Sequence, residues 1–177
     1  MIQAYIGDGK GKSTAALGLL IRALGAGMRV GIIYFDKGNK TYSHHELNVL
    51  ERLGVRHWVT GLERMQPDGR FRFGTTEEDR REAGRGLAIV RSAIASGEFD
   101  LLVLDEIITA ASFGLITPEE LTALISDRKA SGGSLELVLT GRCANEEMLA
   151  GVDLISRVTK VRHYFDSGTK ARPGIEY

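Results

Sequence analysis

The stretch that decides the fold runs from residue 2 to residue 14 and reads Ile2-Gln-Ala-Tyr-Ile-Gly-Asp-Gly-Lys-Gly-Lys-Ser-Thr14. Its apolar opening predicts a strand, and residues 15–24, which follow, have the pattern of a helix. A glycine-rich loop between a strand and a helix lets backbone N–H groups turn toward phosphate. The lysine can balance phosphate charge, and the serine hydroxyl can bind Mg²⁺. The stretch therefore predicts a nucleotide site.

The predicted phosphate loop is one residue shorter than usual. The common pattern Gly-x-x-x-x-Gly-Lys-[Ser/Thr] would place its first glycine at Ile6, whereas this loop begins at the next residue. The loop residues that we assign to the nucleotide are Gly7, Asp8, Gly9, Lys10, Gly11, Lys12, Ser13 and Thr14. Lys10 is either a second phosphate contact or a solvated charge. Asp8 would repel phosphate, so we expect it to point outward or to meet a cation.

Length and composition indicate one globular domain over residues 1–177, with 43% hydrophobic and 26% charged residues. Lys+Arg and Asp+Glu balance at 23 each, so no net charge favours nucleic acid or an anionic membrane. No apolar run approaches the ~20 residues that span a bilayer, and the first strand leaves no room for a signal peptide. Cys143 is the single cysteine, which excludes an internal disulfide and a cysteine-based zinc cage. We expect a cytoplasmic protein that binds neither nucleic acid nor membrane.

Short apolar runs alternate with helix-length segments along the chain. The predicted strands cover residues 2–6, 29–35, 56–59, 101–104, 135–140 and 158–164, and the predicted helices cover residues 13–24, 44–53, 77–96, 118–131 and 146–151. Several strands are apolar on both faces, which is typical of a parallel sheet covered by helices on both sides. We therefore expect an α/β fold with a doubly wound, mostly parallel sheet of about six strands and a phosphate-loop, RecA-like architecture.

Ligands of such sheets bind beyond the carboxyl ends of the strands, so the residues just after each strand carry most weight. These are residues 7–13, 36–38, 61–75, 105–106 and 141–142. Asp105 and Glu106 follow four apolar residues, at a position where carboxylates can hold Mg²⁺ directly or through water. The alternative is a strand end with solvated acids. Which of the two carboxylates touches the ion stays open.

Aromatic and histidine residues outside these motifs have ordinary interpretations. Phe71 and Phe73 lie in a long polar loop, where they either plug the core or offer an apolar wall to a ligand, and the residues alone favour the plug. Trp58 is expected to contribute to the core from a strand. His44 and His45 fall at a helix start without metal-ligand spacing, and we interpret both as surface residues.

Four motifs taken together resemble those of one enzyme family. They are Gly7-Asp-Gly-Lys-Gly-Lys-Ser-Thr-Ala-Ala16 with Gly18, Leu104-Asp-Glu106, Leu139-Thr-Gly-Arg142, and the ending His163-Tyr-Phe-Asp-Ser-Gly-Thr-Lys-Ala-Arg-Pro-Gly-Ile-Glu-Tyr177. In this order they resemble the phosphate-loop ATP:corrinoid adenosyltransferases, which act on cob(I)alamin or cob(I)yrinic acid a,c-diamide. The resemblance covers nearly the whole chain. The short loop and the ending are specific in combination.

The resemblance implies transfer of the 5′-deoxyadenosyl group of ATP to the Co(I) of a corrinoid (cobalamin, cobinamide or cobyrinic acid a,c-diamide), with release of triphosphate. It also implies Mg²⁺ or Mn²⁺ as cofactor, a flavoprotein reductant, a homodimer, and ATP reversed in the loop so that C5′ is exposed. Such an alkyl transfer needs the triphosphate held as a leaving group. Because Co(I) is itself a strong nucleophile, the chain needs no Ser–His or His–carboxylate base.

The resemblance also assigns roles to single residues. Residues Gly9 to Thr14 fall on the family's triphosphate loop, with Lys12 as a catalytic residue, and we place Arg142 with the nucleotide-binding residues. Ser13 and Glu106 fall on the Mg²⁺ ligands, and Asp105 stays the alternative ligand. Phe71 and Phe73 fall on an aromatic pair beneath the corrin. That pair displaces the lower axial ligand and eases reduction of Co(II), a role that replaces the core-plug interpretation.

The chain departs from the family pattern at several points. Asp8 stands where the family usually has Asn, Ser13 where it usually has Thr, and Phe73 where Trp is common. Some members carry an N-terminal extension over the corrinoid, whereas this chain begins at the first strand, so closure is expected from loops or a partner subunit. Two other functions stay open: a phosphate-loop nucleoside kinase and a non-catalytic ATP- or corrinoid-binding protein. The preferred corrinoid and the choice between biosynthesis and salvage are also open.

Overall fold

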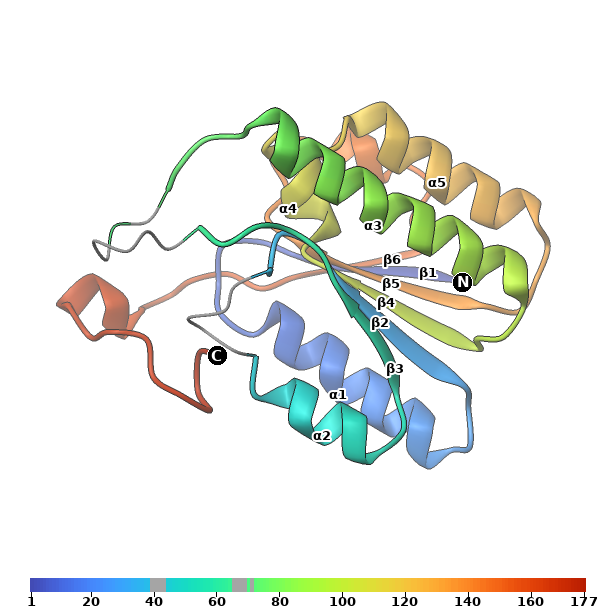
Figure 1. Ribbon diagram of the computed structural model, residues 1–177, viewed down its shortest axis with the longest axis horizontal. Helices are drawn as coiled ribbons and strands as arrows, with labels where there is room; N and C mark the ends of the chain where they lie inside the picture. Colours follow the sequence, from blue (N-terminus) through green and yellow to red (C-terminus); the bar gives the residue numbers. More distant parts are fainter. Residues whose placement is uncertain (39–43, 65–69, 71) are drawn as a thin grey trace.

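A computed structural model describes residues 1–38, 44–64, 70 and 72–177 of the chain. Six strands form one sheet in the order β3-β2-β4-β5-β1-β6, and every neighbouring pair is parallel (Figure 1). The strands are β1 (Ile2–Ile6), β2 (Val30–Tyr34), β3 (Arg56–Val59), β4 (Leu101–Asp105), β5 (Glu136–Gly141) and β6 (Leu154–Arg157). The predicted α/β class and parallel sheet are confirmed.

Helices cover both faces of the sheet. Figure 1 shows α1 (Lys12–Gly25) and α2 (Glu46–Arg52) below the sheet, and α3 (Glu77–Ser96), α4 (Ile107–Ser112) and α5 (Pro118–Ala130) above it. Two short 3₁₀ helices, η1 (Glu146–Leu149) and η2 (Tyr164–Ser167), complete the described elements. Thr76 and Thr117 cap α3 and α5, each accepting a hydrogen bond from the backbone N–H three residues later.

The strands that are apolar on both faces contribute to two separate hydrophobic cores, one on each side of the sheet. In β2, Ile32 and Tyr34 pack on the side of α1 and α2, whereas the alternate residue Ile33 packs on the side of α3. Because side chains alternate along a strand, a strand covered on both faces must be apolar at nearly every position. All five residues of β2 and of β4 are buried accordingly.

The chain leaves the sheet in opposite directions at the ends of β1 and β4. After β1 it enters α1 on one face, and after β4 it enters α4 on the other face (Figure 1). In parallel α/β sheets, a crevice forms at the carboxyl edge where successive connections diverge in this way. The predicted site residues of β1, β4 and β5 therefore meet at one edge.

Two element predictions were wrong, and one helix was missed. The last strand is β6 at Leu154–Arg157, not residues 158–164, because its pairing with β1 ends at Ile6, where the phosphate loop begins. The predicted helix at 146–151 is the short 3₁₀ helix η1. Helix α4 was not predicted, since its six residues are too few to show a helical period.

No helix in the described ranges has both the length and the apolar character needed to cross a membrane.

Candidate active site

The phosphate loop joins β1 to α1 and is packed tightly against the chain that follows β6. The Gly9 N–H donates to the Val158 carbonyl at 2.9 Å. A Cβ atom on Gly7 would lie 2.4 Å from that carbonyl oxygen, and one on Gly9 would lie 2.8 Å from it. Gly7 and Gly11 also have positive φ angles of 113° and 121°. Glycine is therefore required here both for close approach and for backbone conformation.

Lys12 is the buried cation of the loop. Its Nζ donates to the Gly9 carbonyl at 2.9 Å, and the residue is only 8% exposed. Burial lowers the pKa of Lys12, as does the nearby Arg142, while Glu106 and Asp105 act in the opposite direction. An ammonium has three N–H donors, so one carbonyl leaves two donors for phosphate oxygens.

The two uncertain charges of the loop both face other parts of the chain. Asp8 is exposed and accepts the backbone N–H of Lys160 at 3.1 Å, and this hydrogen bond lowers the pKa of Asp8. It thus points outward, as expected. Lys10 lies 4.0 Å from Glu176 in the C-terminal segment. Arg172 and Tyr164 hold that carboxylate by hydrogen bonds and lower the pKa of Glu176 to about 2.

Asp105 is fully buried at the end of β4 and is surrounded by donors. One of its oxygens accepts the Thr140 hydroxyl at 2.7 Å, and the other pairs with the ammonium of Lys37. Burial raises the pKa of Asp105, but Lys37, Thr140 and the Ser13 hydroxyl outweigh burial and lower it. Lys37 in turn has a raised pKa, because Asp105 and Glu106 outweigh the burial of its ammonium. The pair is therefore ionised inside the protein.

Glu106 is set apart from Asp105 by an unusual backbone turn. Its φ angle of 63° is left-handed, and its N–H donates to the Thr140 hydroxyl at 2.9 Å. The Thr109 hydroxyl donates to the carboxylate of Glu106 and accepts the N–H of Arg142 at 2.8 Å. A Cβ atom on Gly141 would lie 2.4 Å from the Thr109 backbone nitrogen, so only glycine permits this contact. The turn places the carboxylate of Glu106 against the Thr109 hydroxyl.

The oxygen donors at this edge fit a magnesium ion. Ser13, Asp105 and Glu106 offer one hydroxyl and two carboxylates, the hard ligands that Mg²⁺ prefers when substrate phosphates and water complete its shell. Among the residues that the structure describes, no three His, Cys, Asp or Glu side chains form a metal cage. Asp105 is already paired with Lys37, whereas Glu106 accepts the Thr109 hydroxyl, and Glu106 as the direct ligand stays a prediction.

A cavity of about 350 Å³ has Thr109 in its lining. Phe73 and Phe113 line it together with Asp36 and Arg64, and these two rings are 85% and 62% exposed. An exposed ring cannot plug a core, so for Phe73 the core-plug interpretation is wrong, while its role as a wall for a ligand stays a prediction. Phe71 lies outside the described residues.

Ion pairs tie the loop that carries Phe73 to the sheet and to α3. The Arg64 Nε donates to both oxygens of Asp36 at 2.9 and 2.8 Å, and its other arm donates to the Gly74 carbonyl at 2.9 Å. Arg72 makes two hydrogen bonds of 2.8 and 2.7 Å to the buried Asp79, and Arg72 lowers the pKa of that carboxyl group. The aromatic cavity is thus lined in part by the ion-paired side chains of Asp36 and Arg64.

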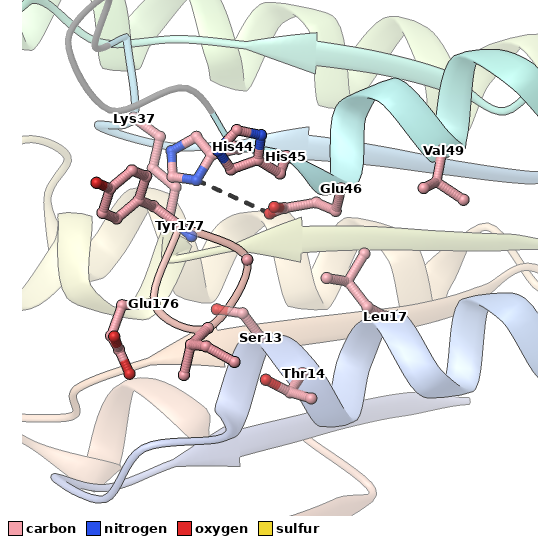
Figure 2. Close-up of a pocket in the computed structure, with 12 residues that line it drawn as sticks. Ser13, Thr14, Leu17, Lys37, His44, His45, Glu46, Val49, Glu176 and Tyr177 are labelled. Carbon is pink, nitrogen blue, oxygen red and sulfur yellow. Dashed lines mark ion pairs between the residues drawn. The ribbon is translucent and has the colours of Figure 1, made fainter. Parts of the chain in front are cut away.

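Another cavity, of about 410 Å³, lies beside the first turn of α1 (Figure 2). His44 stacks on Tyr34 with ring centres 5.7 Å apart, so the prediction of a surface His44 was wrong. Burial lowers the pKa of His44, and the Lys37 charge lowers it further. His45 stacks on Tyr177, which brings the ending Gly174-Ile-Glu-Tyr177 to this cavity and therefore to the phosphate loop.

The structure brings most predicted site residues to one edge and adds several that were missed. Ser13, Asp105 and Glu106 meet there, and Arg142 lies close enough to affect the pKa of Lys12. Lys37 lies in the range 36–38 that the sequence singled out, and Thr140 lies in the motif Leu139-Thr-Gly-Arg142, but neither was assigned a role. Thr109 and Phe113 were missed. Lys37 and Thr140 lie where β2 and β5 end, so their positions were a usable signal. Thr109 and Phe113 belong to the unpredicted helix α4 and its end.

A glycine loop between β1 and α1, with two carboxylates at the end of β4, places this chain in the phosphate-loop class of α/β proteins. The model of the family described as "ATP:corrinoid adenosyltransferase BtuR/CobO/CobP" matches residues 1–177. The chain therefore belongs to the ATP:corrinoid adenosyltransferase family, which confirms the resemblance found in its motifs.

Curated relatives agree with this assignment. The chain is 34% identical over 184 residues to corrinoid adenosyltransferase CobA of Salmonella typhimurium, covering 100% of this chain and 85% of that protein. It is 30% identical over 177 residues to the corrinoid adenosyltransferase of Escherichia coli K12, with the same coverage of 100% and 85%. For the Pseudomonas aeruginosa corrinoid adenosyltransferase the identity is 30% over 179 residues, covering 100% of this chain and 83% of that one.

Proposed function

We propose that this chain transfers the 5′-deoxyadenosyl group of ATP to the Co(I) of a corrinoid and releases triphosphate, in the biosynthesis or salvage of adenosylcobalamin. Membership of the family over residues 1–177 supports this activity. The observation that carries it is that Thr109 touches both halves of the site. Its hydroxyl donates to Glu106 on the nucleotide side, and the residue also lines the cavity that holds Phe73.

In this reaction the electron pair of Co(I) attacks C5′ of the ribose. A cobalt–carbon bond forms, the bond from C5′ to the α-phosphate oxygen breaks, and its electron pair leaves with the triphosphate. No proton moves, so no protein base is needed. The chain's task is to hold the leaving group and stabilise its growing charge. Lys12, the loop N–H groups, Lys10 and Arg142 are the groups that we assign to this task.

Mg²⁺ or Mn²⁺ is the cofactor that we propose for the triphosphate, held by Ser13 and Glu106. When bound, it would neutralise part of the phosphate charge. In this proposal Asp105 does not contact the ion itself. It accepts the Ser13 hydroxyl and keeps the hydroxyl oxygen pointing to the site. The Lys37 pair with Asp105 supports this division of roles between the two carboxylates.

The aromatic side of the site is proposed to prepare the corrinoid. Phe71 and Phe73 would pack beneath the corrin, displace its lower axial ligand and make Co(II) easier to reduce. The exposed ring of Phe73 in the cavity supports that role. We further propose a flavoprotein as reductant, a homodimer as the working form and the cytoplasm as its location.

Product analysis tests the proposal. The chain is incubated without oxygen with chemically reduced cob(I)alamin, Mg²⁺ and ATP, and the spectrum of the cobalt–carbon product is followed. Triphosphate is the expected second product. ADP would instead indicate a kinase or a hydrolase, and unchanged ATP with measurable binding would indicate a non-catalytic sensor. With a single cysteine, the chain lacks the ligands for the cysteine-bound zinc lobe that thymidine-type kinases carry.

A further inference from the structure

One face of α4 runs from the nucleotide side of the site to the aromatic cavity. Glu106 precedes the helix, Thr109 lies in its first turn and Phe113 follows its last residue. The four-residue separation of Thr109 and Phe113 places their side chains on the same helical face. The contacts agree, because Thr109 donates to Glu106 and also lines the cavity with Phe113.

Phe113 combines a fixed backbone with an exposed ring. Its N–H donates to the Thr109 carbonyl at 3.0 Å, and its own carbonyl accepts the Thr75 hydroxyl at 3.1 Å. The next carbonyl, that of Gly114, accepts Arg80 Nε at 3.2 Å. The ring is nevertheless 62% exposed and lines the cavity. A large apolar ring held in this way, inside a concave site, gains most when a ligand covers it.

We propose that Phe113 is a second aromatic wall of the corrinoid site, which contacts the corrin ring and the methyl groups at its edge and sets the affinity for corrinoid. The inference rests on the proposed function. It gives Phe113 a different task from Phe73: Phe113 stands on the end of a helix and fixes position, whereas Phe73 stands on a loop and acts on the axial ligand. Phe113 also lies seven residues beyond Glu106, about 10 Å along a helix. That distance leaves room for the adenosyl group between them.

Substitution at Phe113 tests the proposal with Phe165 as matched control. Phe165 is 69% exposed, lies in η2 and does not line the aromatic cavity. With chemically made cob(I)alamin, Phe113→Ala is expected to raise the KM for corrinoid about tenfold, the loss typical of an aromatic contact. The KM for ATP, kcat and the melting temperature should stay unchanged. Phe113→Tyr, which keeps the ring, should restore the KM, and Phe165→Ala should behave as the wild type.

A binding measurement gives a second readout that does not depend on turnover. The chain has one tryptophan, Trp58, so Phe113→Trp and Phe165→Trp each add a single reporter to a common background. Corrinoids absorb where tryptophan emits and quench a nearby indole. Adding cob(II)alamin should quench the added fluorescence of Phe113→Trp strongly and that of Phe165→Trp weakly. Equal quenching in the two variants would overturn the proposal.

The kinetic outcomes separate this inference from the proposed function. If the wild type releases triphosphate but Phe113→Ala keeps a normal KM for corrinoid, the inference alone is wrong. A rise in the KM for ATP instead would mean that the ring stacks on the adenine, and this too would overturn it. If the wild type releases ADP, the proposed function fails and the inference fails with it.

Discussion

The two ends of the candidate site differ in the polarity and burial of their side chains. At the phosphate end, Lys12, Lys37 and Asp105 are charged, largely buried and bonded to partners inside the protein. At the other end, which we propose holds the corrinoid, Phe73 and Phe113 are apolar and exposed, at 85% and 62%. Polar groups are thus already in place where the proposed reaction needs charge to be stabilised. Apolar groups stay exposed where a large ligand is proposed to bind.

This contrast has an energetic meaning. A buried charge is costly unless it is paired, so the phosphate end must be assembled when the chain folds. An exposed ring adds little to folding and contributes when a ligand removes it from water. Substitutions at the phosphate end should therefore affect stability or chemistry, and substitutions at the corrinoid end should affect the corrinoid alone.

The largest effect is expected from Lys37→Met. This change leaves the fully buried carboxylate of Asp105 without its cation, and breaking such a pair typically costs about 3–5 kcal/mol in the free energy of unfolding. Urea denaturation measures the loss. The matched control is Lys129→Met, since Lys129 is 46% exposed in its pair with Asp153. Exposed pairs contribute about 0–1 kcal/mol.

A second substitution shows whether the unpaired charge is the cause. In the Lys37→Met background, Asp105→Asn removes that charge, so the double variant should recover part of the lost stability. Equal losses in the free energy of unfolding for Lys37→Met and Lys129→Met would contradict the claim that the buried pair of Lys37 and Asp105 stabilises the phosphate end.

Lys12→Ala is expected to act on chemistry more than on stability. The ammonium donates to the Gly9 carbonyl within the loop and is proposed to stabilise the triphosphate as it leaves. Removing one such group from a preorganised site typically lowers kcat by about 10²–10³-fold. Triphosphate release from cob(I)alamin and ATP measures the change, with Lys129→Ala as control. Full activity in Lys12→Ala would remove the triphosphate assignment.

Glu106→Gln should shift the metal requirement. Glutamine keeps the size of the side chain and can still accept the Thr109 hydroxyl, but it loses the charge that attracts a divalent ion. Loss of one carboxylate ligand is expected to raise the Mg²⁺ concentration for half-maximal activity about tenfold. The titration is repeated at saturating ATP. An unchanged Mg²⁺ requirement would point to Asp105 as the direct ligand.

The phosphate end was the part most open to prediction from sequence. Its loop is contiguous, and strand, glycines, lysine and helix follow one another from Ile2 onward, so a short-range pattern contains the geometry. The end of β4 was predicted for the same reason, since Asp105 and Glu106 directly follow an apolar run. The parallel sheet followed from strands that are apolar on both faces.

The parts that escaped prediction depend on contacts between distant segments. Lys37 and Asp105 are 68 residues apart, and only the pairing of β2 with β4 reveals that they meet. Helix α4 is six residues long, too short for a period, so the face that carries Phe113 was invisible. The last strand was misplaced because its pairing with β1 ends at Arg157, and the backbone of Val158 instead packs against Gly7 and Gly9 of the phosphate loop.

The smallest effect, and the most selective one, is expected from Phe73→Ala. Because the ring is 85% exposed, stability should change by less than about 0.5 kcal/mol. The proposed role of the ring is to displace the axial ligand before reduction, so it should matter only when the reaction starts from Co(II). Two assays separate the steps: one supplies chemically made Co(I), and the other supplies Co(II) with a reduced flavoprotein.

Phe73→Ala should keep transfer from Co(I) within about twofold and lose about tenfold with the flavoprotein, the range of an aromatic contact. Phe113→Ala, by contrast, should raise the KM for corrinoid equally in both assays, because a wall that only positions the macrocycle does not distinguish cobalt oxidation states. Equal loss for Phe73→Ala in both assays would reduce its role to positioning. The two rings would then have the same role, and the proposed difference between Phe73 on the loop and Phe113 at the end of the helix would be wrong.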